Sequence, residues 1–274
     1  FRMSNKVDKL FHVFRDQWYL FDIVSLEIIL VLILWSLFSS WTRVHRGLIL
    51  AALITAVCVI IVPNRLLGSL FADQRLYEPM LTFALLSIGF SAKTPRRLPQ
   101  ILFAGAVLFA GARLASNVVS LVQLGNRSAE HLRVLEVLPR DAQMVNFRAT
   151  FCPPPMQWRI DRWTHLGGYA LARRHVFSND QFEIPGGQLL RIHNADVGRF
   201  EADDSQIVYE VPCRGRPGVV AKAEEVPAAI PYLWVIWSGE PKPLRFWQPL
   251  ARNGRSILYR RPPAPRPAVA PGAG

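Results

Sequence analysis

The chain has 274 residues, of which 51% are hydrophobic and 19% are charged, and its formal net charge is +12. A soluble globular chain carries about 25% charged residues, so this composition favours a membrane protein. The apolar content excludes a chain that is disordered throughout, and three cysteines are too few for a disulfide scaffold. The cations are spread singly along the chain, which argues against a nucleic-acid partner and favours membrane lipids as partners.

Four apolar segments predict an α-helical integral membrane region with four spans, at residues 19–124. A helix needs roughly 20 mostly apolar residues to cross a bilayer, and it satisfies its own backbone amides there. The segments are residues 23–41, 47–63, 76–92 and 99–124.

Residues 1–18 are predicted to form an amphipathic helix that lies along the membrane interface. The apolar side chains recur at spacings of three and four, and charged residues take the other faces. The apolar positions are Val7, Leu10, Phe11, Phe14 and Trp18.

Two short basic loops indicate the orientation. Residues 42–46 and 93–98 contain five Lys or Arg residues and no acid, which the positive-inside rule places in the cytoplasm. Four further cations precede the first span and oppose this assignment. We expect the amino terminus, residues 64–77 and the carboxy-terminal domain to lie on the outer side.

The pattern becomes globular in residues 125–261, where short apolar strands predict an α/β or mainly β soluble domain. The expected strands are residues 132–138, 144–151, 206–211, 232–237 and 256–259. Residues 166–177 fit either a helix or a strand. The Pro-rich residues 262–274 are predicted to be a disordered tail.

Cys152 and Cys213 are candidates for a disulfide, because an outer location permits pairing. Their loop of about 60 residues would give roughly 4 kcal/mol of stabilisation in chain-entropy models. Two independent buried thiols are the alternative.

The usual catalytic motifs are missing: there is no HExxH, P-loop, GxSxG or CxxC. No cofactor is identified. Glu201, Asp203 and Asp204 form an acidic cluster that could contact a divalent cation, or that forms a solvated turn.

Two sets of residues are candidates for binding a substrate. Asp73 and Arg75, in a loop beside the membrane, could bind a lipid phosphate or orient a sugar, or could form a surface ion pair. His165, Arg173 and Arg174 could face a sugar-phosphate headgroup, or could have structural roles in the outer domain.

Glu27 and Arg113 are ionisable groups inside predicted spans. Their distances from the outer surface, about 9 Å and about 10 Å at 1.5 Å per residue, are similar. Intramembrane charges are costly, so we expect the two to pair, with separate snorkelling as the alternative.

The order of these elements resembles the carboxy-terminal half of bacterial multi-pass membrane proteins related to GT-C glycosyltransferases. The resemblance rests on residues 19–22, 63–75, 165–166, 172–174, 177, 182 and 232–237. It implies the transfer of sugars from polyprenyl-phosphate donors at the periplasmic face of the bacterial inner membrane. It also implies a truncated form, because the family's acidic catalytic residue lies in an outer loop with no equivalent here.

A second hypothesis is a non-catalytic membrane assembly or scaffold protein. Its periplasmic domain would bind another envelope protein.

Overall fold

The computed structural model describes residues 3–66, 69–152, 158, 161–181, 191–201 and 205–262, and it divides the chain into two compact units. Of these described residues, the helical unit comprises 3–66, 69–123 and 158, and the sheet unit comprises the rest. The predicted tail lies outside the described residues beyond its first position.

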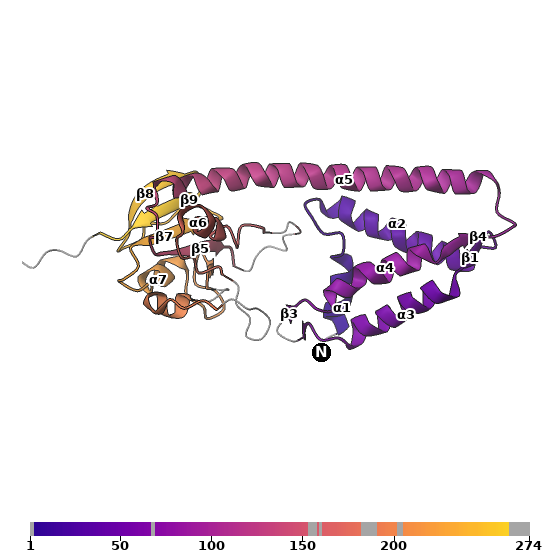
Figure 1. Cartoon of the computed structure of the whole chain (residues 1–274), viewed down its shortest axis with the longest axis horizontal. Coiled ribbons are helices and arrows are strands. Elements are labelled where there is room, and N and C mark those ends of the chain that lie inside the picture. Colours follow the sequence, from indigo (N-terminus) through magenta and orange to yellow (C-terminus); the bar gives the residue numbers. More distant parts are fainter. Residues whose placement is uncertain are drawn as a thin grey trace, which may run out of the picture. The chain divides into compact units, whose positions relative to one another are not determined.

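Helices joined by short strand pairs build the helical unit (Figure 1). Helix α4 packs against α2 and α3. Strand β1 follows α2 and strand β4 follows α4, and the two strands pair antiparallel. This pair lies at the end of the unit opposite α1 (Figure 1). The elements are α1 (Met3–Phe11), α2 (Tyr19–Phe38), β1 (Thr42–Val44), α3 (Arg46–Ile61), β2 (Arg65–Leu66), β3 (Ser69–Leu70), η1 (Gln74–Leu76), α4 (Tyr77–Leu86), β4 (Ile88–Phe90) and the first part of α5 (Arg97–Leu132).

The prediction of four membrane spans is wrong. Within the described part of the chain, two helices are long and apolar enough to cross a membrane, Tyr19–Phe38 and Arg97–Val137. Helix α3 has 16 residues and α4 has 10, or about 24 Å and about 15 Å, against about 30 Å of hydrocarbon. The third segment falls short because its last residues leave the helix to form β4.

The sheet unit is built on a five-stranded mixed sheet. The strands lie in the order β6 (Ile207–Tyr209), β5 (Met144–Thr150), β7 (Tyr232–Ile236), β9 (Ser256–Arg260) and β8 (Gln248–Asn253). Strand β5 is parallel to both of its neighbours, and β9 is antiparallel to both of its own.

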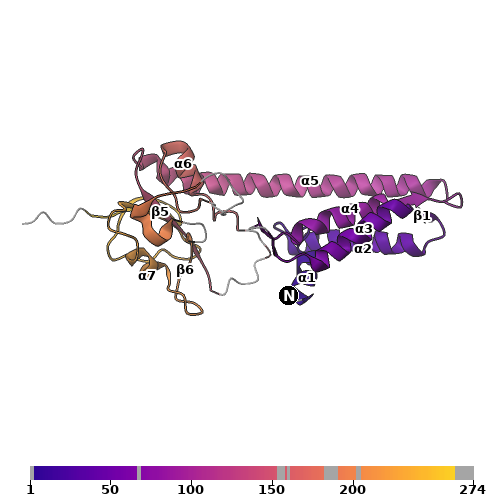
Figure 2. The same cartoon turned by 60° about the horizontal axis from the view of Figure 1, so that its bottom comes forward.

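Helices cover both faces of this sheet, which resolves the open choice in favour of an α/β domain. Alternate residues of β5 point to opposite faces. Phe147 packs in the core with α7 (Val219–Glu224) and η3 (Ala195–Phe200), and Met144 packs with α6 (Gly168–Arg174) and η2 (Arg133–Val137). Figure 2 shows α6 and α7 on opposite sides of β5. Residues 132–138, predicted as a strand, are the end of α5 followed by η2.

Cys152 and Cys213 form a disulfide, with their Cα atoms 5.8 Å apart. Each follows the carboxyl end of a parallel strand, Cys152 after β5 and Cys213 after β6. Because these strands are neighbours in the sheet, their ends bring the two cysteines together.

Candidate functional site

A buried carboxylate, Asp73, ties α1 to the chain between α3 and α4. Lys6 Nζ lies 2.6 Å from Asp73 Oδ2, and Lys9 Nζ lies 2.9 Å from Oδ1 and 2.7 Å from Oδ2. Lys6 also donates to the carbonyl of Val62 at 2.6 Å, and Lys9 donates to Asn64 Oδ1 at 3.0 Å. We call these five residues the Asp73 cluster.

Two ammonium groups share the single carboxylate of Asp73. Burial would raise the pKa of the Asp73 carboxyl, but hydrogen bonds and positive charge from Lys6 and Lys9 outweigh burial and lower that pKa below its ordinary value. The carboxylate is therefore ionised at neutral pH, and the cluster carries one net positive charge. Arg75, predicted to act with Asp73, is exposed and forms no ion pair with it, both residues being described.

A second buried carboxylate, Asp22, lies at the start of α2. Its Oδ1 accepts from Arg113 Nη1 at 2.6 Å, and its Oδ2 accepts from Trp158 Nε1 at 2.6 Å and from the Asp16 amide at 2.8 Å. Arg113 also donates to the carbonyl of Phe14 at 3.0 Å. We call these five residues the Asp22 cluster.

The predicted pair of Glu27 with Arg113 is therefore wrong in its acidic partner. Glu27 is exposed, whereas Asp22 is fully buried. The two acids are five residues apart on α2, which separates them by about 140° around the helix. The prediction compared only the depths of Glu27 and Arg113 in the membrane. Glu27 and Asp22 lie on different faces of α2, and Asp22 is on the face that meets Arg113.

Trp158 joins the Asp22 cluster from far along the chain. Its ring centroid lies 5.3 Å from that of His12 and 4.9 Å from that of Tyr19, and its carbonyl accepts from Arg15 Nε at 2.6 Å. No local pattern in the sequence predicts this placement. For Asp22 a signal existed, because it is an acid immediately before a long apolar run.

The predicted residues His165, Arg173 and Arg174 contact their own unit. His165 is exposed, with Nδ1 3.4 Å from the Asp180 carbonyl. The Arg173 guanidinium lies 5.4 Å from the Tyr169 ring centroid, and Arg174 donates to the carbonyl of Glu136 at 2.6 Å. These three contacts go to three different partners within the sheet unit.

A buried polar network surrounds Asp180 in the sheet unit. Ser178 Oγ lies 2.7 Å from Asp180 Oδ1 and 2.8 Å from Asn146 Oδ1, and the Gly168 amide donates to Asp180 Oδ2 at 2.9 Å. Burial raises the pKa of the Asp180 carboxyl despite these bonds. Gly167 packs directly on the network, since an added Cβ would collide with Ser178 Oγ and with the Asn146 side chain. Such tight packing is typical of a polar network that stabilises the fold.

Among the residues that the structure describes, no three His, Cys, Asp or Glu side chains are grouped as metal ligands. Asp203 and Asp204 of the predicted acidic cluster lie outside those residues.

Comparison with protein-family models, with curated proteins and with solved structures finds no match to this chain.

Proposed function

We propose that this chain is a membrane-anchored protein of the bacterial inner membrane, with α2 and α5 crossing the bilayer. Exposure supports this placement: Leu108 on α5 is 74% exposed, and none of the apolar window of that helix is buried within the protein. So large an exposed apolar surface is typical of a face covered by lipid or by a partner. The shorter helices α3 and α4 pack alongside.

Two features support a periplasmic location for the sheet unit and for the end of the helical unit that carries α1. Disulfides such as Cys152–Cys213 are typical of oxidising compartments, of which the periplasm is one. The five cations of residues 42–46 and 93–98 lie at the β1–β4 end of the helical unit, and the positive-inside rule favours the cytoplasm for them.

We further propose that the protein is GT-C-like and binds the phosphate of a polyprenyl-phosphate-linked sugar beside the Asp73 cluster. The observation that carries this proposal is the net positive charge of Lys6, Lys9 and Asp73, next to exposed Arg75 and to apolar helices. Charge-assisted hydrogen bonds from Lys and Arg are the strong contacts to a phosphate. The proposal assigns binding and no catalytic step to these residues.

Binding of a polyprenyl phosphate, compared with the matching polyprenyl alcohol, tests this function. The full chain in phosphatidylcholine nanodiscs should bind the phosphate and not the alcohol. Arg75→Gln should weaken binding about five-fold, the effect of one cation near a headgroup. Arg133→Gln, which removes an exposed cation from the sheet unit, is the matched control and should leave binding unchanged. Equal binding of the phosphate and the alcohol would contradict the proposal.

The second candidate is a non-catalytic assembly protein whose periplasmic domain binds another envelope protein. The contacts of Arg173 and Arg174 with groups of their own unit weigh against the headgroup site predicted there, and so leave a role for this domain other than sugar-phosphate binding. A chain that binds no polyprenyl phosphate but forms a stoichiometric complex with one envelope protein would decide for this candidate.

A further inference from the structure

The β1–β4 end of the helical unit gathers cations from three elements. The ladder pairs Thr42 with Phe90 and Val44 with Ile88, and the Ser91 amide donates to the Trp41 carbonyl at 2.9 Å. Two loops that are about 50 residues apart in the chain thereby form one surface. Its cations are Arg43, Arg46, Lys93, Arg96 and Arg97, which we call the basic face.

Among the residues that the structure describes, no acid pairs with the basic face. All five side chains are exposed, and none forms an ion pair within the described parts of the chain. Residues 28–72 and 79–129 contain neither Asp nor Glu. Within the described residues, the charge of the basic face is therefore not compensated by an ion pair.

Two helix amino termini add to this positive field. Arg46 is the first residue of α3 and Arg97 is the first residue of α5, and neither helix has an acid in its first turn. A helix amino terminus carries a partial positive charge and favours anions, so a cation there is unfavourable unless an anion lies near it.

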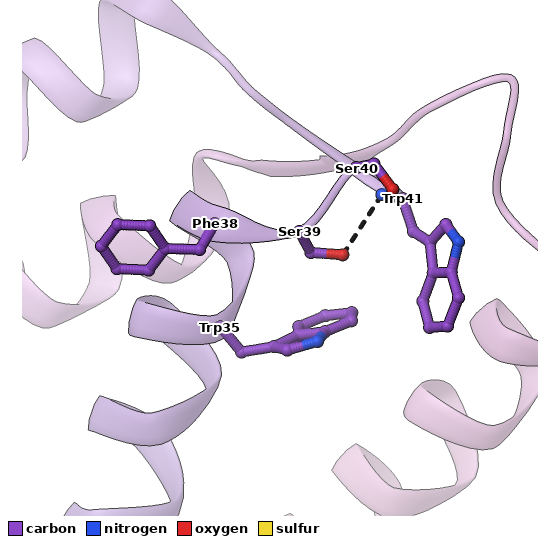
Figure 3. A pocket seen from close by; sticks show the side chains of 5 residues that line it. All are labelled: Trp35, Phe38, Ser39, Ser40 and Trp41. Atoms are coloured by element: carbon purple, nitrogen blue, oxygen red, sulfur yellow. Dashed lines mark hydrogen bonds between the residues drawn. The ribbon is translucent and has the colours of Figure 1, made fainter.

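An aromatic hollow lies beside the basic face. It is an open hollow of about 390 Å³ lined by Trp35, Phe38, Ser39, Ser40 and Trp41. Figure 3 shows the Trp35 and Trp41 rings near the turn at Ser39, with Phe38 pointing away from Trp41. Trp side chains favour the zone where lipid headgroups meet acyl chains. The hollow thus offers an apolar surface directly next to cations.

We propose that the basic face and the hollow bind an anionic phospholipid of the surrounding leaflet. The phosphate lies against the cations of the basic face, and the glycerol and upper acyl carbons lie in the aromatic hollow. The inference rests on the membrane placement proposed above, and it concerns the end of the helical unit opposite α1, the helix that carries Lys6 and Lys9 of the Asp73 cluster (Figure 1).

Counting bound lipid tests the site. The full chain is placed in phosphatidylcholine nanodiscs, phosphatidylglycerol is titrated in, and native mass spectrometry counts the lipid retained. The variant with Arg43→Gln, Arg46→Gln and Arg96→Gln removes three cations of the basic face. At about five-fold per charge, its apparent affinity for phosphatidylglycerol should fall about 100-fold. At 1 M salt the wild-type preference should disappear, because the Debye length is then about 3 Å.

A matched variant separates the site from net charge. Arg133→Gln, Arg140→Gln and Arg214→Gln remove three exposed cations of the sheet unit and should leave phosphatidylglycerol binding unchanged. Equal unfolding midpoints of the two triple variants in detergent would show that folding does not explain a difference.

Four outcomes would overturn the inference. They are equal wild-type affinity for the two lipids, equal losses in the two triple variants, displacement of the lipid by inorganic phosphate, and failure of the chain to enter nanodiscs. The last would also refute the proposed membrane placement, whereas the first three leave polyprenyl-phosphate binding at the Asp73 cluster untouched.

Discussion

The helical unit leaves far more apolar surface exposed than the sheet unit does. In the helical unit Asp22 and Asp73 are fully buried, while Leu108 is 74% exposed. In the sheet unit Leu233 and Trp234 are fully buried, and the cations Arg133, Arg140 and Arg214 are exposed.

This difference indicates what holds each unit together. Burial of apolar surface away from water stabilises the sheet unit. In lipid that driving force is missing between helices, so packing and interhelical polar contacts must hold them. The long-range bonds of Asp22 and Asp73, each to donors from other elements, have this role in the helical unit.

The largest effect on stability is expected from the loss of a buried charge in the helical unit. Asp22→Ala leaves the Arg113 guanidinium without its carboxylate and should destabilise the protein by about 3–5 kcal/mol. Thermal unfolding of the full chain in detergent measures this. Glu27→Ala, on the same helix but exposed, leaves the bond between Asp22 and Arg113 in place and should not destabilise the protein. Equal losses in both variants would refute the assigned pair.

The sheet unit should be broken most by loss of its disulfide. Cys152→Ser opens a loop of 61 residues and should lower the free energy of unfolding by about 4 kcal/mol. Urea unfolding followed by Trp fluorescence measures the change. Cys58→Ser, which alters a cysteine outside the disulfide, is the control, and reducing agent should affect it as much as it affects the wild type.

A cation placed on an exposed apolar position distinguishes the solvents of the two units. Leu108→Arg should cost about 3 kcal/mol if α5 crosses the bilayer near that residue, and should lower the amount of protein in the membrane fraction. Leu250→Arg, on exposed strand β8 of the sheet unit, should have almost no effect. A harmless Leu108→Arg would show that water, not lipid, surrounds α5.

The smallest effects should appear as opposite pH slopes. The pKa of Asp180 is raised, so the folded state binds its proton more tightly, and stability should fall as pH rises from the ordinary carboxyl value through the raised one. The pKa of Asp73 is lowered, so its contribution is present above the ordinary value and is lost as pH falls through the lowered one. A carboxyl whose pKa differs by one between the folded and unfolded chain changes the free energy of unfolding by at most about 1.4 kcal/mol.

Substitution by Asn tests both slopes. Asp180→Asn should remove the loss of stability on the alkaline side of its window, and Asp73→Asn should remove the loss on the acidic side. Measured unfolding curves at several pH values that show the same slope for both variants would contradict the assignment.

The sequence predicted most of the sheet. Residues 144–151, 206–211, 232–237 and 256–259 contain β5, β6, β7 and most of β9, because each is a short apolar run between turns. Strand β8 was missed because it is an edge strand with Pro249 and polar residues, so it lacks the apolar pattern.

The sequence predicted less of the candidate sites. Hydropathy located α2 and α5, but it did not show that residues 88–90 pair with β1, since that pairing is tertiary. Asp73 was selected for its place in a loop between apolar segments, but its partners Lys6 and Lys9 were assigned to the polar face of an interfacial helix. Contacts such as that of Trp158 with Asp22 join residues more than 130 positions apart, beyond any local pattern.

The disulfide has a practical consequence for any sample of this protein. Cys152 and Cys213 are 61 residues apart, so a single proteolytic cut between them leaves the two fragments covalently joined. A nicked chain would then migrate as one species on a non-reducing gel and separate into two only after reduction. A single band without reductant is therefore no measure of an intact backbone in this protein.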